Sequence, residues 1–457
     1  MSEWVDLLCD PGSFAPVDTD ESGTPAIDVG VATISGEAAV LAACRFEELA
    51  GTLSLAGSRR FLAGVELARQ QGLPLFAVAN SGGCRMQEGA AAFMTMRDLA
   101  TAIARFKAEG NLFSVYLAHP TTGGVFASWG SLGHLTFAEP DATIGFTGPR
   151  VAAALGEPIL PAEIQTAEGL FAAGQIDAVI ARENLRAVWG SCARAARSAS
   201  KLSLASLAAT GPDRTAASAA KVDVSSSPST PDRPIPPRGW AAVVSSRRAG
   251  RPNLVKDMAA QAQEWIEISG DRCGQVAEEV SVSIAVFGDR SAVVIGHRSD
   301  GDLRSRPTTA GLRLARRGLE IANALGLAVI TVVDTAGARL GAEEEGQGMA
   351  GEIARSLHDF SALSVPSLAV IAGQGCGGAA LAWCNTDAIF AAEDAWIAPI
   401  APEAGSLIVH RNMDRAEEIA DLQRCSGAEL LEQGLIDAVV PFEGLAAAAF
   451  DWLNALA

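Results

Sequence analysis

The chain lacks several features that mark whole classes of protein. None of its eight cysteines lies in a Cys-x-x-Cys pair, so a zinc ribbon is not supported. No apolar run approaches the roughly 20 residues of a membrane-spanning helix. The amino terminus does not have the layout of a signal peptide. We therefore expect a cytoplasmic protein with reduced thiols, no metal site and no membrane attachment.

Basic residues are also scarce. The 457 residues include 35 Lys and Arg against 53 Asp and Glu, which gives a formal net charge of −18. An acidic chain is a poor partner for nucleic acids and anionic membranes, and we expect neither. Aromatic residues make up only 5%, whereas glycine occurs 46 times, which favours close helix packing and sites built from backbone groups. The length suits two or three domains.

The most informative feature present is a repeat. Arg85 and Arg339 each follow a turn that contains glycine, and they are 339 − 85 = 254 residues apart. Gly124 and Gly378 each belong to a Gly-Gly pair, and they are also 378 − 124 = 254 residues apart. Glycine pairs at a fixed offset indicate two equivalent sites, one in each half. Because glycine lets a ligand approach the backbone closely, both are candidate binding pockets.

The two halves are separated by a stretch of different composition. Residues 197–238 are rich in Ser, Ala and Pro, and such a stretch buries too little apolar surface to order itself. We interpret it as a linker between domains at 1–196 and 239–457, the alternative being an ordered surface excursion. Each half alternates short apolar strands with amphipathic helices, which predicts an α/β fold with layered sheets and helices.

Both Gly-Gly pairs come where a predicted strand ends and a helix begins. The strands are expected at 73–79, 112–118, 327–333 and 365–372. The helix before the first of these strands is expected to begin with Ser58 as its N-cap and to end at Gly72. The first N–H groups of a helix have no internal partner and carry the positive end of the helix dipole. They would polarise a carbonyl oxygen and stabilise it further as it becomes an anion. The alternative is that these glycines only permit tight strand–helix packing.

The chain resembles a known enzyme family along nearly its whole length outside the linker. The first half is similar to the β half of acetyl-CoA carboxylase carboxyltransferase at residues 8–14, 81–89, 120–125, 138–142 and 144–150. The second half is similar to the α half at residues 250–252, 270–272, 294–297, 334–338, 341–348 and 375–379. The longest of these motifs, at 81–89, runs to nine residues in order.

This resemblance implies two tandem crotonase-like (ClpP/crotonase) domains of repeated ββα units. In that family an acyl-CoA thioester binds the β-type domain and carboxybiotin the α-type domain. The residues implied as catalytic backbone donors are Gly123 and Gly124 for the thioester carbonyl, and Gly377 and Gly378 for the ureido oxygen of biotin. The residues implied to contact substrate are Ser81, Gly82, Gly83, Arg85, Thr122, Gly337 and Ala338. An enolate of the acetyl or short acyl group would capture the carboxyl group, with no metal required.

The family likeness also implies partners. No Met is followed by Lys, so the chain lacks the biotinylation motif of carrier domains. Biotin would arrive on a separate biotin carboxyl carrier protein, loaded by a biotin carboxylase. In the family, pockets of opposite type face each other across a dimer, so at least a homodimer is expected.

Some positions depart from the family pattern and leave other functions open. His119 replaces the usual Asp before Pro120, and Ala336 and Cys376 replace Pro and Ser. A biotin-independent decarboxylase of malonyl-type thioesters, bound to CoA or acyl carrier protein, and a non-catalytic partner subunit are the alternatives. Arg85 and Arg339 would either steady a turn or reach an anion. His119 would be structural or a proton carrier, and Cys376 a packing residue.

Overall fold

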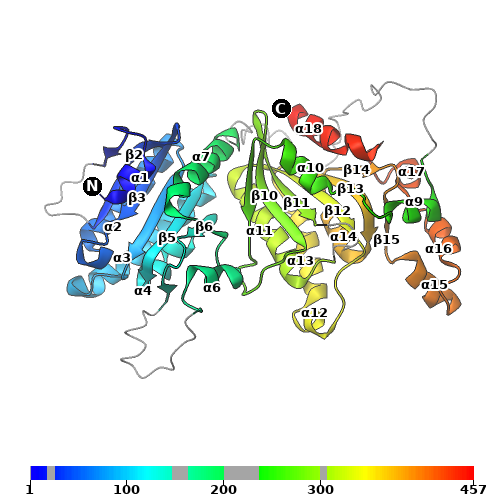
Figure 1. Cartoon of the computed structure of the whole chain (residues 1–457), viewed down its shortest axis with the longest axis horizontal. Coiled ribbons are helices and arrows are strands. Elements are labelled where there is room, and N and C mark those ends of the chain that lie inside the picture. The colour runs from blue at the N-terminus through cyan, green and yellow to red at the C-terminus, as the bar shows by residue number, and fades with distance from the viewer. Residues whose placement is uncertain (1, 18–25, 147–162, 200–235, 299–305, 457) are drawn as a thin grey trace. The chain divides into compact units, whose positions relative to one another are not determined.

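The computed structural model describes residues 2–17, 26–146, 163–199, 236–298 and 306–456. Most of the predicted linker, and residues 147–150 of one family motif, lie outside these ranges. Contacts divide the chain into two compact units (Figure 1). Unit 1 comprises residues 1–197 and 268–276, and unit 2 comprises 198–267 and 277–457.

Unit 1 is built on an eight-stranded sheet with the order β1-β2-β3-β4-β5-β6-β8, and β7 pairs with β5. The first three strands pair antiparallel and the others parallel. The strands are β1 (Ala15–Pro16), β2 (Ile27–Ile34), β3 (Glu37–Cys44), β4 (Leu75–Ser81), β5 (Phe113–Thr122), β6 (Leu135–Ala138), β7 (Ile144–Gly145) and β8 (Ala178–Val179). The α-helices are α1 (Glu3–Leu8), α2 (Leu55–Gln71), α3 (Gly89–Ala108), α4 (Gly123–Phe126), α6 (Ala167–Ala172) and α7 (Arg182–Ala199).

Unit 2 repeats this topology, with the order β9-β10-β11-β12-β13-β14-β16 and β15 paired with β13. The strands are β9 (Glu264–Ile268), β10 (Val280–Phe287), β11 (Arg290–His297), β12 (Ala328–Thr335), β13 (Ser367–Cys376), β14 (Ala388–Ala392), β15 (Trp396–Ala398) and β16 (Ala438–Val440). The α-helices are α9 (Gly239–Ser246), α10 (Leu254–Gln261), α11 (Thr309–Leu325), α12 (Ala342–Gly346), α13 (Met349–Ser361), α14 (Gly377–Trp383), α15 (Pro402–His410), α16 (Ala416–Gln423), α17 (Gly427–Glu432) and α18 (Leu445–Ala455).

The two sheets share an irregularity at equivalent places. The β4–β5 register shifts so that Ser81 pairs with Thr121, and the β12–β13 register shifts so that Thr335 pairs with Gly375. Both shifts fall where the strands run into the repeated turns. The duplication seen in the sequence is therefore a duplication of backbone geometry at the predicted sites.

The core of unit 1 lies between its sheet and helices α2 and α3. Fully buried side chains such as Phe61, Phe106 and Phe113 belong to this core, and each contributes roughly 1.5–3 kcal/mol by leaving water. Helix α2 approaches the sheet closely, because a Cβ at Gly64 would overlap the Val29 side chain. In unit 2, a Cβ at Gly318 of α11 would lie 2.7 Å from Val282. These glycines serve packing alone.

The four predicted strands form, and the structure extends or shifts each by a few residues. Gly72 ends α2 in the left-handed conformation, as predicted. The prediction that Ser58 caps this helix is wrong, because Ser58 is buried inside α2 and the Ser54 hydroxyl accepts the Gly57 N–H at 3.0 Å. The helix starts earlier because residues 55–57 are compatible with its first turn.

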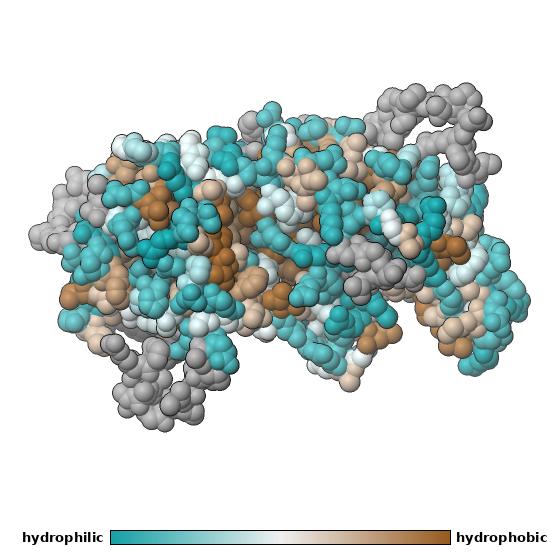
Figure 2. Space-filling view, viewed as in Figure 1, coloured by the Kyte–Doolittle hydropathy of each residue, from teal (hydrophilic) through white to brown (hydrophobic). Residues whose placement is uncertain are grey.

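Unit 2 exposes large apolar side chains at one end. Figure 2 shows brown and tan atoms over α15 and α16. Among the helices of the described ranges, a membrane-spanning candidate is not found. The exposed side chains are Leu407, Ile408, Val409, Met413 and Leu422. Apolar surface gathered in this way marks a candidate interaction site.

A short segment of the second half completes unit 1. The Asp177 side chain is fully buried and accepts hydrogen bonds from the Thr136 N–H, the Ser269 N–H and the Arg272 guanidinium at 2.7, 3.1 and 2.6 Å. A Cβ at Gly270 would overlap Gly174, so the segment 268–276 lies against unit 1 backbone to backbone. The Gly-Asp-Arg motif at 270–272 thus has a structural role.

We expect Arg272→Met to destabilise unit 1 by about 3 kcal/mol, because it leaves the buried Asp177 carboxylate without its cation. Urea unfolding of the full chain, followed by hydrogen exchange in unit 1, measures this change. Arg69→Met, which breaks exposed pairs with Glu66 and Glu109, is the matched control and should cost far less. Equal losses in the two variants would contradict the expectation.

Candidate active site

The first predicted site is a corner where two backbone segments touch. Strand β5 ends at Thr122, and α4 begins with Gly123, whose φ is +69°. The turn after β4 lies against this helix start, because a Cβ at Gly83 would come within 3.1 Å of the Gly124 nitrogen and 3.3 Å of the Thr122 oxygen. Gly83 also has a φ of +109°, which only glycine adopts without strain. A side chain at 83 would push the corner apart.

The turn is held from beneath by a buried hydroxyl. The Ser81 Oγ accepts the Gly83 N–H at 3.0 Å and donates to the Gly51 oxygen at 2.7 Å. The Gly82 N–H donates to the Ala50 oxygen at 2.9 Å. Ser81 is fully buried, so it shapes the turn and does not face solvent.

The two glycines of the first pair have different roles. The Gly123 N–H donates to the Phe146 oxygen at 3.1 Å, so this amide is occupied. The Gly124 N–H lies in the first turn of α4, where no intrahelical acceptor exists, and no other described residue accepts from it. The free donor of the pair is therefore Gly124.

A second amide beside Gly124 was missed by the sequence reasoning. The bridge between Leu53 and Cys84 uses the Gly83 oxygen (2.9 Å) and the Arg85 N–H (3.0 Å), which turns the Cys84 N–H to the opposite side. A Cβ placed on Gly124 would lie 4.0 Å from the Cys84 nitrogen. The Cys84 amide therefore lies close to Gly124. Only a prediction of how residues 49–54 pair with this turn would have revealed it.

The polar side chains near this corner act on the protein itself. The Arg85 guanidinium donates to the Thr52 oxygen at 2.9 Å and lies 4.0 Å from Glu88, so it steadies the turn. The His119 Nδ1 accepts the Thr143 N–H at 3.1 Å. This bond fits a structural histidine and not the alternative role of proton carrier. Thr122 precedes α4 without making a side-chain cap.

The second predicted site has the same kind of turn. The Thr335 Oγ1 accepts the Gly337 N–H at 3.1 Å, as Ser81 does for Gly83, and the φ of Gly337 is +105°. The Arg339 N–H donates to the Pro307 oxygen at 2.9 Å, which leaves the Ala338 N–H on the other side of the chain. Gly377 begins α14 with a φ of +74°.

Helix α13 supports the second corner. A Cβ at Gly378 would lie 3.1 Å from the Ile353 side chain, and a Cβ at Gly337 would lie 3.5 Å from the Cys376 oxygen and sulfur. Ala338 and Ile353 pack on a small buried apolar cluster formed by Leu312, Met349 and Ala379. The Cys376 thiol is buried, and burial raises its pKa, so it is a packing residue and not a nucleophile.

Arg247 fixes the end of β13 and was also missed. Its Nε donates to the buried Gln374 side chain at 3.0 Å, and its other nitrogens bind Glu403. The guanidinium lies over the rings of Trp240 and Trp396 at 5.9 and 5.7 Å. In the sequence, only the position of Arg247 before the Gly-Arg-Pro motif at 250–252 could have pointed to this role.

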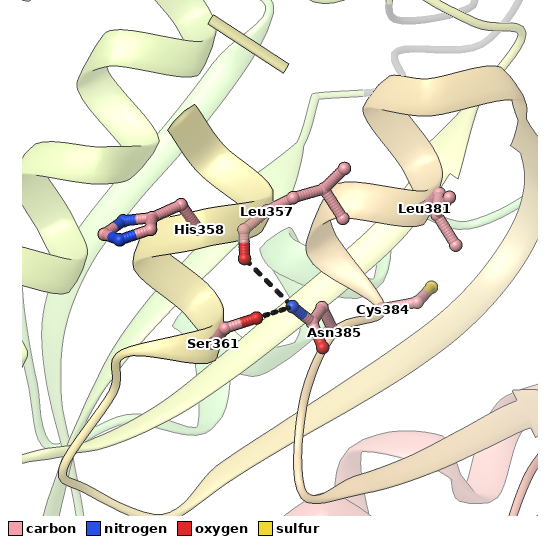
Figure 3. Close-up of a pocket in the computed structure, with 6 residues that line it drawn as sticks. All are labelled: Leu357, His358, Ser361, Leu381, Cys384 and Asn385. Atoms are coloured by element: carbon pink, nitrogen blue, oxygen red, sulfur yellow. Dashed lines mark hydrogen bonds between the residues drawn. The ribbon is translucent and has the colours of Figure 1, made fainter. Parts of the chain in front are cut away.

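A surface hollow of about 440 Å³ lies between α13 and α14 (Figure 3). It is lined by Leu357, His358, Ser361, Leu381, Cys384 and Asn385. The Asn385 amide donates to the Leu357 oxygen and the Ser361 hydroxyl at 2.9 and 2.7 Å, so it joins the two helices. The hollow lies at the end of α14 opposite to Gly377. Across the described ranges, no cluster of His, Cys, Asp or Glu has the arrangement of a metal site.

Two strand-to-helix corners with glycine turns, on a duplicated α/β fold, are therefore the candidate sites. Known proteins share this fold and much of the sequence. Residues 238–456 match the family model described as acetyl co-enzyme A carboxylase carboxyltransferase-like. A probable biotin-dependent acyl-coenzyme A carboxylase beta3 subunit of Mycobacterium tuberculosis is 39% identical over 432 residues, covering 93% of this chain and 81% of that protein. The acetyl-coenzyme A carboxylase carboxyl transferase subunits beta/alpha of Salinispora tropica is 33% identical, covering 96% and 77%.

Solved structures share the fold at lower identity. The transcarboxylase 12S hexamer with hydrolysed methylmalonyl-coenzyme A bound has a TM-score of 0.76 at 19% identity, covering 99% of this chain and 88% of that one. A single-chain, multi-domain long-chain acyl-CoA carboxylase has a TM-score of 0.73 at 17% identity, covering 98% and 45%. The predicted crotonase-like fold of two tandem domains is confirmed. The chain belongs to the family of biotin-dependent acyl-CoA carboxylase carboxyltransferase subunits.

A buried histidine in unit 2 provides a pH test. His297 ends β11 and is 1% exposed, and burial lowers its pKa from 6.5 to about 3. The folded state therefore keeps it neutral where the unfolded state takes up a proton. Its contribution to stability is complete above pH 6.5 and is lost progressively as the pH falls toward 3.

We expect His297→Phe to remove this part of the acid sensitivity. Between pH 7 and pH 4.5, the free energy of unfolding of unit 2 should fall by about 2 kcal/mol less in the variant than in the wild type. Urea unfolding at the two pH values measures the difference, and carboxylates common to both proteins cancel. Identical pH dependence would refute the assignment.

Proposed function

We propose that this chain transfers a carboxyl group between carboxybiotin, carried on a separate protein, and the α-carbon of an acetyl- or short acyl-CoA thioester. The product would be a malonyl-type thioester. The observation that carries this proposal is the pair of equivalent corners, in each of which a glycine turn held by a buried hydroxyl accompanies a helix that begins at a Gly-Gly pair. Family membership sets the class of reaction, and the corners supply its polarising groups.

Unit 1 would take the thioester. Its carbonyl oxygen would accept from the Gly124 and Cys84 N–H groups, at the positive end of α4. When a proton leaves the α-carbon, the negative charge collects on this oxygen, so both hydrogen bonds strengthen as the enolate forms. Gly123 would hold the corner through Phe146, while Ser81, Gly82, Gly83, Arg85 and Thr122 keep the turn in place.

Unit 2 would take biotin, which supplies the transferable carboxyl group. The small residues Gly337, Ala338 and Gly378 would give its ureido oxygen access to backbone amides, and a Cβ at Gly378 would lie 3.1 Å from the Ile353 side chain. The Ala338 and Gly378 N–H groups would bind that oxygen, and Gly377 would give α14 its starting conformation. Because the sequence lacks a Met-Lys pair, a biotin carboxyl carrier protein and a biotin carboxylase would be the partners.

We also propose at least a homodimer. The apolar side chains exposed on and beside α15 and α16 are too many to be scattered single residues, and burial against another subunit would remove them from water.

Carboxyl exchange tests the function. The pure protein should carboxylate free biotin, or a biotinyl carrier, from malonyl-CoA, and methylmalonyl-CoA and longer thioesters would define the acyl preference. Gly124→Ala should lower the rate about 10²-fold, because its methyl group sits beside the Cys84 N–H where the oxygen would bind. The new Cβ makes only ordinary contacts of 3.9–4.0 Å, so the fold should persist.

Gly346→Ala is the matched control, because nothing lies within 4 Å of its added Cβ and its φ is not in the left-handed region. It should keep wild-type activity. Release of CO2 without biotin, insensitive to avidin, would replace the proposal with a decarboxylase. Absence of both exchange and thioester binding would indicate a non-catalytic subunit.

The oligomer has its own test. Ile408→Asp combined with Leu422→Glu should shift the protein to a smaller species in light scattering after size-exclusion chromatography, because two charges would be buried in an apolar interface. Leu49→Asp, at an exposed apolar residue of unit 1, is the comparison. An unchanged mass of the double variant would show that this surface is not the contact.

A further inference from the structure

The buried ring of His297 contacts both backbone segments that form the second corner. Its Nδ1 lies 3.2 Å from the Val332 oxygen and 3.3 Å from the Asp334 nitrogen. With the proton on Nδ1, the ring donates to Val332; with the proton on Nε2, Nδ1 accepts the Asp334 N–H. In either tautomer the ring holds the last residues of β12, directly before the turn that contains Gly337.

The same ring supports α14. It stacks on the indole of Trp383 with the ring centroids 4.0 Å apart and the planes inclined by 25°. The Trp383 oxygen accepts the Thr331 hydroxyl at 2.7 Å, which joins α14 to β12 a second time. Since α14 is only seven residues long and starts at Gly377, a shift of Trp383 would move the Gly378 amide.

Packing alone does not explain why an imidazole and not a benzene ring stands at position 297. His297 Nε2 and Trp383 Nε1 are both buried, and neither finds a hydrogen-bond partner within the described ranges. A buried polar atom without a partner is destabilising, whereas a phenylalanine would stack without that cost. The imidazole is therefore favoured by what Nδ1 does at the turn.

Unit 1 supplies an internal comparison. Cys44 occupies the position of His297, since Cys44 pairs with Ile27 as His297 pairs with Val280 at the corresponding end of each hairpin. The Cys44 thiol interacts with the Asn80 backbone, at the residue before the first turn. However, a thiol cannot stack on an indole as an imidazole does. Unit 1 therefore supports its turn without tying it to α4 in this way.

We propose that His297 is a positioning residue of the second site: it sets the spacing between the 335–338 turn and the start of α14. That spacing places the Ala338 and Gly378 amides, so this inference rests on the proposed biotin-binding role of unit 2. Unit 1 would be insensitive to His297. The consequence is a defect confined to one substrate.

The experiment compares His297→Phe, which keeps the stacking, with His297→Asn, whose amide places a polar atom near Nδ1. His134→Phe is the matched control, because His134 is also buried and accepts the Phe113 N–H at 3.2 Å, at the end of β5 remote from Gly123. We would measure kcat/KM for free biotin, thioester affinity by calorimetry, and amide hydrogen exchange of peptides covering 332–339 and 78–85.

His297→Phe should lower kcat/KM for biotin about tenfold, leave thioester affinity unchanged, and speed exchange in 332–339 but not in 78–85. His297→Asn, which keeps a polar atom at the turn but cannot stack on Trp383, should restore slow exchange in 332–339 and leave kcat/KM for biotin low. Equal effects of His134→Phe, equal losses for both substrates, or unchanged exchange in 332–339 would overturn the proposal. If the wild-type protein transfers no carboxyl group, the proposed function fails, while the hydrogen-exchange comparison still decides whether His297 positions the turn.

Discussion

The contact between a glycine turn and the first residues of a short helix is the constraint on which the molecule depends. At Gly83 a single added carbon would come within 3.1 Å of the Gly124 nitrogen, so the sheet must deliver two strand ends to nearly the same point. The register shifts in β4–β5 and β12–β13 do this. Helices α2, α11 and α13 then hold the arrangement by packing.

The two units keep this frame and differ in what supports it. Ser81 and Thr335 accept the same turn amide, and the left-handed glycines recur with nearly the same angles. At the end of β3 unit 1 has Cys44, whereas unit 2 has His297 at the equivalent end of β11. Asp334 Oδ1 accepts the Gln374 N–H at 2.9 Å, a bond that its equivalent Asn80 cannot make with Pro120, which has no N–H. Duplicated backbone with divergent supports is how one fold would come to bind two different ligands.

The sequence predicted the frame well, because strand ends, glycine pairs and a constant offset are local signals. It predicted where Gly124, Gly378 and both turns lie, but not that the Gly123 amide is occupied by the Phe146 oxygen, since that bond joins the start of α4 to the residue after β7. Ser54 was missed as the cap because Ser58 has the same propensity. Cys84, Arg247 and His297 owe their roles to contacts across 31 or more residues, which spacing alone does not reveal.

The segment 268–276 has a consequence for how such chains are divided. It begins more than seventy residues after residue 197, where the rest of unit 1 ends. Even so, its Arg272 pairs with Asp177 and its Gly270 lies against Gly174. A polypeptide cut anywhere in 200–235 would leave the first fragment missing an internal piece that the second fragment carries. The two fragments would have to associate for unit 1 to be complete.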